Sequence, residues 1–107
     1  MYELKILPKE LKNKLDLNEN LFLLDVRNPN EYEIAKINNS VLIPLPQLRS
    51  RLHEIPKDKE IIVYCHHGNR SLEAARILNE NGFSQVKSLV GGIDVWSRFV
   101  DSSIPQY

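Results

Sequence analysis

Apolar residues along this chain form short continuous runs, and the segments between these runs have the spacing of helices. The runs cover residues 21–24, 41–43 and 61–64. A short continuous apolar run predicts a strand that is covered on both faces of its sheet. A weaker alternation of apolar and polar residues over 2–7 predicts a further short strand at the start. Residues 85–89, which are of mixed polarity, are predicted to form the last strand. The pattern therefore predicts five strands.

A short helix is predicted after each of the first three strands. Pro8 begins a predicted helix over residues 8–15, and Pro46 begins another, because proline fits the first helical turn. Between them, Asn30 is predicted to cap a short helix. Each of these helices is expected to cover one face of the sheet with its apolar side.

Two helices are predicted in the second half of the chain. The first covers residues 71–81 and ends at Gly82, a residue that commonly terminates helices. The second carries Trp96 and Phe99, which are expected to face the core because of their helical spacing. Residues 101–107 are predicted to be frayed, as is common at the end of a chain.

Strands that alternate with helices predict an α/β fold with a mainly parallel sheet and helices on both faces, a three-layer α/β/α arrangement. In such sheets the ligand lies beyond the carboxyl ends of the strands. The length of 107 residues is close to the commonest domain size. We therefore expect residues 1–107 to form a single domain.

Composition and charge argue against several classes of protein. Basic and acidic residues number 14 each, so the formal net charge is zero, and no basic surface for nucleic acid or anionic membrane is predicted. No apolar run approaches the roughly 18 residues of a membrane-spanning helix. The first residues lack the pattern of a signal peptide, and one cysteine excludes an internal disulfide. We therefore expect a cytoplasmic protein.

The strongest candidate for chemistry is the single cysteine, Cys65, which directly follows the run 61–64. A short loop with Gly68 leads from it into a predicted helix, whose free N–H groups and dipole favour an anion. Arg70 adds a permanent charge and a planar fork of donors. A lone cysteine is usually a small buried hydrophobe. Here its position after the apolar run, beside glycine and arginine, favours a nucleophilic thiolate.

The segment around this cysteine resembles the active-site loop of rhodanese-like sulfurtransferases. The loop reads Cys65-His66-His67-Gly68-Asn69-Arg70-Ser71. Further matches to the family, in the same order along the chain, are Leu24-Asp25-Val26-Arg27, Glu31-Tyr32, Ile43-Pro44 and Gly91-Gly92 followed by Trp96. Together they span roughly residues 21–98.

One segment departs from the family pattern. Where relatives usually show Gly-His-Ile-x-Gly-Ala, this chain reads Ala35-Lys36-Ile37-Asn38-Asn39-Ser40. Asn39 stands in place of a glycine, and asparagine tolerates a left-handed backbone better than most residues. We therefore expect the turn to survive at this position.

The resemblance implies a rhodanese-like fold with five parallel strands, of which the central one carries Cys65. It also implies a reaction: Cys65 takes a sulfane sulfur from thiosulfate or a persulfide donor, holds it as a persulfide, and passes it to an external thiol acceptor, a small molecule or a protein. The residues implied in substrate binding are those of the loop, His66, His67, Gly68, Asn69, Arg70 and Ser71.

Asp25 and Arg27 end the second predicted strand, and we interpret them as a pair that supports the neighbouring loops, with a catalytic part as the alternative. No metal and no organic cofactor is expected. His66 and His67 beside Cys65 suggest zinc, but His53 is the only further histidine and no Cys-x-x-Cys is present.

Two other functions stay open at this point. A cysteine phosphatase or arsenate reductase on the same architecture also pairs a cysteine with an arginine around an oxyanion. Four residues separate Cys65 from Arg70, however, one fewer than in cysteine phosphatases. The other alternative is a non-enzymatic sulfur carrier that docks on a partner.

Overall fold

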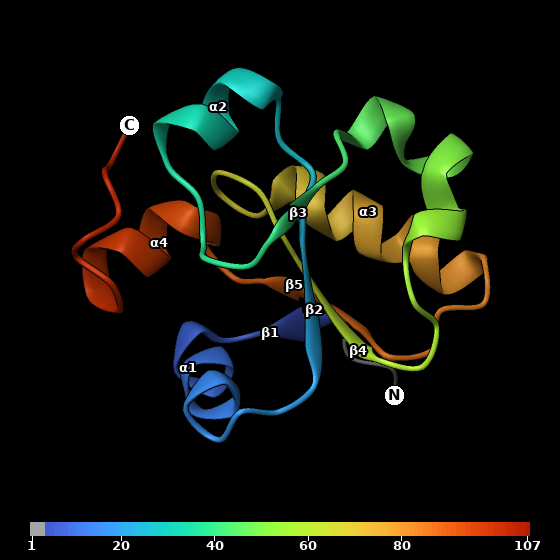
Figure 1. Cartoon of the computed structure of the whole chain (residues 1–107), viewed down its shortest axis with the longest axis horizontal. Helices are drawn as coiled ribbons and strands as arrows, with labels where there is room; N and C mark the ends of the chain where they lie inside the picture. The colour runs from blue at the N-terminus through green and yellow to red at the C-terminus, as the bar shows by residue number, and fades with distance from the viewer. Residues whose placement is uncertain (1–3) are drawn as a thin grey trace.

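The computed structural model describes residues 4–107 and contains a five-stranded sheet. The strands, in the order β1-β5-β4-β2-β3 across the sheet, are β1 (Lys5–Ile6), β2 (Leu21–Asp25), β3 (Val41–Leu42), β4 (Glu60–Tyr64) and β5 (Val86–Leu89). All four neighbouring pairs are parallel, and β4 is the central strand (Figure 1). The prediction of a central strand leading to Cys65 is confirmed. Residues 2 and 3 of the predicted first strand lie outside the described residues.

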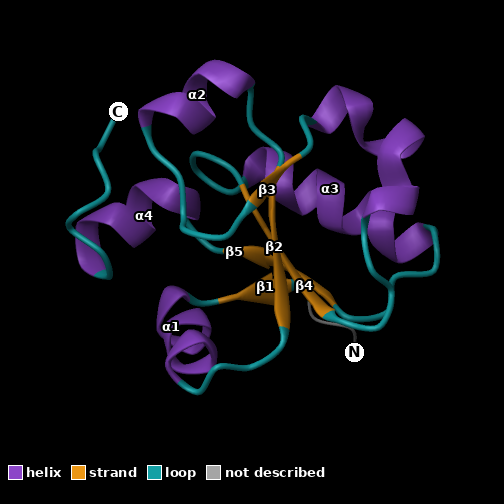
Figure 2. Ribbon diagram, in the orientation of Figure 1, coloured by secondary structure: helices purple, strands orange, loops and turns teal. Residues whose placement is uncertain are grey.

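Helices cover both faces of this sheet (Figure 2). They are α1 (Pro8–Asp16), α2 (Pro29–Ile34), the 3-10 helix η1 (Leu45–Glu54), α3 (Asn69–Glu80) and α4 (Gly92–Phe99). Side chains of α3 and η1 form one core with the sheet, and side chains of α1 and α4 form the other. The predicted three-layer α/β/α fold is thus confirmed.

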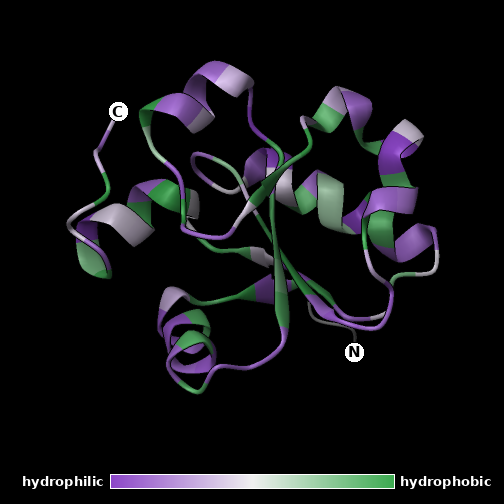
Figure 3. Ribbon diagram, viewed as in Figure 1, coloured by the Kyte–Doolittle hydropathy of each residue, from purple (hydrophilic) through white to green (hydrophobic). Residues whose placement is uncertain are grey.

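The central strand shows why its sequence is a continuous apolar run. Ile61 and Val63 belong to the core beneath α3, whereas Ile62 and Tyr64 belong to the core beneath α1 and α4. Successive side chains of a strand point to opposite faces, so burial on both faces requires apolar residues at every position. Figure 3 shows hydrophobic green over the middle of the central strands, whereas the helices around them carry both purple and green residues.

The short helix α2 begins earlier than predicted. Its N-cap is Asn28, in an extended conformation, and Pro29 takes the first helical position, so the prediction that Asn30 caps the helix is wrong. The residue before a proline is restricted to extended conformations, and proline itself is suited to the first helical position. The carboxylate of Glu31 accepts a hydrogen bond from the Asn28 N–H at 3.1 Å, which completes the cap.

The last helix and the segment after it also differ from the prediction. Trp96 is buried, as expected, but Phe99 is 80% exposed. Ile93, Trp96 and Phe99 are three residues apart, which is less than the 3.6 residues of one helical turn. Each step therefore rotates the side chain around the helix, and Phe99 no longer lies on the face that buries Ile93. Residues 101–107 are packed instead of frayed: Ile104 is buried in the core beneath α4. None of the helices within 4–107 has the length and apolar character that crossing a bilayer requires.

Candidate active site

Cys65 follows β4 directly, so its sulfur lies at the carboxyl edge of the central strand. The residue is only 1% exposed. The loop turns at Gly68, whose φ of +113° falls in the left-handed region that favours glycine. Helix α3 therefore begins at Asn69, two positions before the predicted start, and its N-terminus faces the cysteine.

Backbone donors of this loop converge on the sulfur. The N–H groups of Gly68 and Ser71 donate to the Cys65 Sγ at 3.1 and 3.3 Å. The thiol lies 3.5 Å from the Ser71 Oγ, to which it donates. The Ser71 hydroxyl is fixed in turn by the Gly68 carbonyl at 3.1 Å and by the Ser88 hydroxyl at 2.7 Å. The site therefore offers two N–H groups to a negatively charged sulfur.

The start of helix α4 is hydrogen-bonded to the backbone of the cysteine loop. The N–H groups of Ile93 and Asp94 donate to the carbonyls of Cys65 and His66 at 2.9 and 3.0 Å. This approach requires Gly92, because a Cβ at that position would lie 2.4 Å from both carbonyl oxygens. The Gly91-Gly92 pair, singled out in the sequence, thus brings two N–H groups of a helix start against the cysteine loop.

Arg70 is engaged by a carboxylate from α2. Its Nη1 and Nη2 donate to the two oxygens of Glu31 at 2.8 and 3.0 Å. The carboxylate is also bound by the Asn28 N–H and by the Tyr107 hydroxyl. The predicted fork of donors is therefore paired with a partly buried carboxylate beside the loop, and the charge of Arg70 is partly neutralised there.

The pair with Arg70 makes folding stability dependent on pH. The hydrogen bond from Arg70 is the main cause that lowers the pKa of Glu31 from 4.5 to about 2. Ionised Glu31 therefore stabilises the folded protein above about pH 4.5, and this contribution is lost as the pH falls towards 2. We expect Glu31→Gln to be less stable than the wild type by about 1–3 kcal/mol at pH 7, a difference that shrinks by pH 2.

Urea denaturation at pH 7, 5 and 3 measures this difference. Glu73, on the exposed side of α3, supplies the control variant Glu73→Gln. A Glu31→Gln deficit that stayed constant across the pH range would contradict the assigned pairing.

The two histidines of the loop have different surroundings. His66 is half-buried, and its ring lies 4.0 Å from that of His67 and 4.0 Å from that of Tyr107. Burial, with the adjacent His67, lowers the pKa of His66. His67 and Asn69 are exposed, and the His67 Nδ1 lies 3.6 Å from a carboxylate oxygen of Asp94. Both exposed side chains stand at the rim of the loop.

Asp25 and Arg27 form a fully buried ion pair at the end of β2. The Asp25 carboxylate accepts bonds from the Arg27 N–H, Nε and Nη2 at 2.7–3.1 Å. Arg27 also donates to the carbonyl of Ala35 at 2.6 Å and to the Tyr107 hydroxyl at 2.6 Å. Burial works against its charge, but the bonds to Asp25 and Tyr107 raise the pKa of Arg27. Through Arg27, the pair joins three segments around the site.

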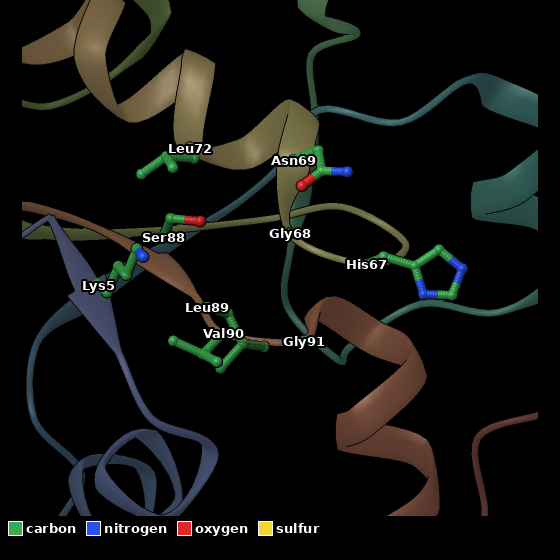
Figure 4. Close-up of a pocket in the computed structure, with 9 residues that line it drawn as sticks. All are labelled: Lys5, His67, Gly68, Asn69, Leu72, Ser88, Leu89, Val90 and Gly91. Atoms are coloured by element: carbon green, nitrogen blue, oxygen red, sulfur yellow. The ribbon is translucent and has the colours of Figure 1, made fainter.

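A surface pocket of about 170 Å³ lies next to the loop (Figure 4). It is lined by Lys5, His67, Gly68, Asn69, Leu72, Ser88, Leu89, Val90 and Gly91. Cys65 is not among these residues, so the pocket does not reach the sulfur. Within 4–107, no three side chains of histidine, cysteine, aspartate or glutamate are grouped so as to hold a metal ion.

Residues 7–99 match the family model described as Rhodanese-like domain. The chain belongs to this family. Among solved structures, a rhodanese-related protein from Thermoplasma volcanium is similar to this rhodanese-like domain, with a TM-score of 0.82, 33% identity and coverage of 91% of this chain and 92% of that one. Among curated proteins, a sulfurtransferase of Allochromatium vinosum is 34% identical over 90 residues, which cover 84% of each chain.

The rhodanese-like domain spans about a quarter of the length of several other curated relatives. One of these is the adenylyltransferase and sulfurtransferase MOCS3-1 of Zea mays, which is 36% identical over 110 residues. These residues cover 96% of this chain and 24% of that protein.

The structure adds three residues to the site that sequence reasoning had not assigned to it. Glu31 binds Arg70, Ser88 binds Ser71, and Tyr107 binds Glu31 and Arg27. The spacing Asn28-x-x-Glu31 is a capping-box pattern and marks Glu31 as a polar residue with a structural part. Ser88 and Tyr107 carry no local signal, because their partners lie 17 and 76–80 positions away.

Proposed function

We propose that this rhodanese-like domain is a sulfurtransferase that carries a sulfane sulfur on Cys65. The observation that supports it most directly is the pair of N–H groups, from Gly68 and Ser71, at 3.1 and 3.3 Å from the Sγ. Such donors stabilise a thiolate before the reaction and a negatively charged persulfide after it. The name of the Allochromatium vinosum relative agrees with this chemistry.

The proposed donor is thiosulfate or a persulfide. The Cys65 thiolate attacks the outer sulfur of thiosulfate, a new S–S bond forms, and the bond between the two donor sulfurs breaks. Sulfite leaves with the electron pair, and Cys65 remains as a persulfide. An external acceptor, cyanide or a thiolate, then attacks the terminal sulfur and releases the Cys65 thiolate. Two half-reactions at one sulfur give ping-pong kinetics.

The remaining loop residues are proposed to bind the sulfur compound. Gly68 and Ser71 supply the N–H groups, and Arg70, held at the edge of the loop by Glu31, adds positive charge towards an anionic donor. His66, His67 and Asn69 form the rim. Asp25 and Arg27 are proposed to hold the neighbouring loops through their ion pair and the bond from Arg27 to the Ala35 carbonyl.

The test is intact-mass analysis of the purified protein after treatment with thiosulfate or a low-molecular-weight persulfide. We expect the wild type to gain one sulfur atom and to lose it again with cyanide or dithiothreitol. Cys65→Ser should gain none, and since Cys65 is the only cysteine, the variant is a complete blank.

Aryl phosphate hydrolysis is measured on the same preparation. Absence of any sulfur adduct with both donors would contradict the proposal. Phosphatase turnover that depends on Cys65 and exceeds sulfur transfer would favour phosphatase chemistry in its place.

A further inference from the structure

The segment after α4 folds back towards the cysteine loop. The N–H of Asp101 donates to the carbonyl of Trp96 at 2.9 Å, and that of Ile104 donates to the carbonyl of Asp101 at 3.2 Å. Ile104 is buried beneath α4 and anchors the segment. Figure 1 shows the end of the chain beside α2, on the side where the loop leaves the sheet. The anchor therefore delivers Tyr107 to the site.

Tyr107 contacts three groups that surround the loop. Its hydroxyl accepts a hydrogen bond from the Arg27 Nη1 at 2.6 Å and donates one to the Glu31 Oε2 at 2.8 Å. Burial raises the pKa of Tyr107 to about 12, so the hydroxyl keeps its proton at neutral pH. Its ring stacks on that of His66 with centroids 4.0 Å apart and planes 9° from parallel. One side chain thus joins the supporting arginine, the partner of Arg70 and the residue next to Cys65.

The stack on Tyr107 leaves one nitrogen of the His66 ring unpaired among the described residues. The His66 Nε2 is buried and, within 4–107, has no hydrogen-bond partner. A buried imidazole nitrogen without a hydrogen-bond partner is destabilising. If Tyr107 left His66, water could bind this nitrogen and remove that cost. The Tyr107 side of the stack remains 38% exposed, so it can leave without disturbing the core. These properties would allow the Tyr107 ring to leave and return to His66.

We propose that Tyr107 determines which compounds reach Cys65. In the closed arrangement, the ring of Tyr107 on His66 admits small sulfur compounds and keeps larger ones from the sulfur. A bulky acceptor, such as a thiol on another protein, reaches Cys65 only after Tyr107 has left His66. The inference rests on the proposed function, since it concerns the size of the sulfur donor and acceptor.

Alkylation of Cys65 tests this without requiring sulfur transfer. Because Cys65 is the only cysteine, the alkylation rate measures access to this site and to no other. Rates are compared for iodoacetamide, a small reagent, and for a maleimide that carries a polyethylene glycol chain. We expect Tyr107→Ala to raise the rate with the large reagent by about tenfold and the rate with the small one by about twofold or less. Tyr107→Phe keeps the ring and should retain most of the discrimination.

Phe99→Ala is the matched control, because Phe99 is an aromatic residue near the same segment that is 80% exposed at the end of α4. It should change neither rate, and thermal unfolding verifies that each variant is folded. An equal rise with both reagents in Tyr107→Ala would overturn the proposal, because loosening of the loop would explain it. Unchanged rates would overturn it too. Neither result affects the persulfide test, so the two proposals fail separately.

Discussion

Arg27→Leu should lower the free energy of unfolding by about 3–5 kcal/mol, the largest stability loss that we expect from one substitution in this protein. Both Asp25 and Arg27 are 0% exposed, and their closest contact is 2.7 Å. Leucine fills part of the space but leaves the Asp25 carboxylate buried without its partner. Removing one member of a buried pair is far more costly than removing both, because the remaining charge has lost its solvation.

Urea denaturation measures this loss, and two further variants interpret it. The double variant Asp25→Leu, Arg27→Leu should recover part of the stability, because no buried charge remains. Arg51→Leu removes a comparable ion pair with Glu54 on the surface and should change stability little. If Arg27→Leu cost no more than Arg51→Leu, the buried pair would not hold the loops as described.

Gly92→Ala should impair the cysteine loop more than any other single methyl group added to the chain. The new Cβ would lie 2.4 Å from the carbonyl oxygens of Cys65 and His66, and both are backbone atoms that cannot move aside without shifting the loop. The φ of +60° at this position adds strain for any residue other than glycine. We expect a stability loss of at least about 2 kcal/mol and at least tenfold slower persulfide formation on Cys65.

Gly82→Ala separates the effect of backbone strain from the effect of the clash with the loop. Gly82 also has a left-handed backbone, with φ at +90°, but its added Cβ would meet only the flexible end of Lys57 at 3.2 Å. We expect this control to lose about 1 kcal/mol and to form the persulfide at the wild-type rate. Equal rates of persulfide formation in Gly92→Ala and the wild type would show that the contact with α4 does not position the sulfur.

The sequence by itself determined the strands, the layers and the position of the cysteine. Residues 61–64 are apolar at every position because both faces of β4 are buried, and that pattern is local. Cys65 could be assigned to the edge of the sheet because it directly follows that run. Asn39 has a φ of +67°, as its place in the turn predicted, since the constraint acts on a single residue.

Only the tertiary structure decided what surrounds the sulfur. Arg70 was expected to face an oxyanion, and the fold pairs it with Glu31, 39 positions away in sequence. Residues 101–107 show no periodic pattern, yet Tyr107 stacks on His66 and binds Arg27, 80 positions distant. Local periodicity reports which face of an element is buried. The partner of a polar side chain depends on which elements the sheet order brings together, and that order follows from packing of the whole chain.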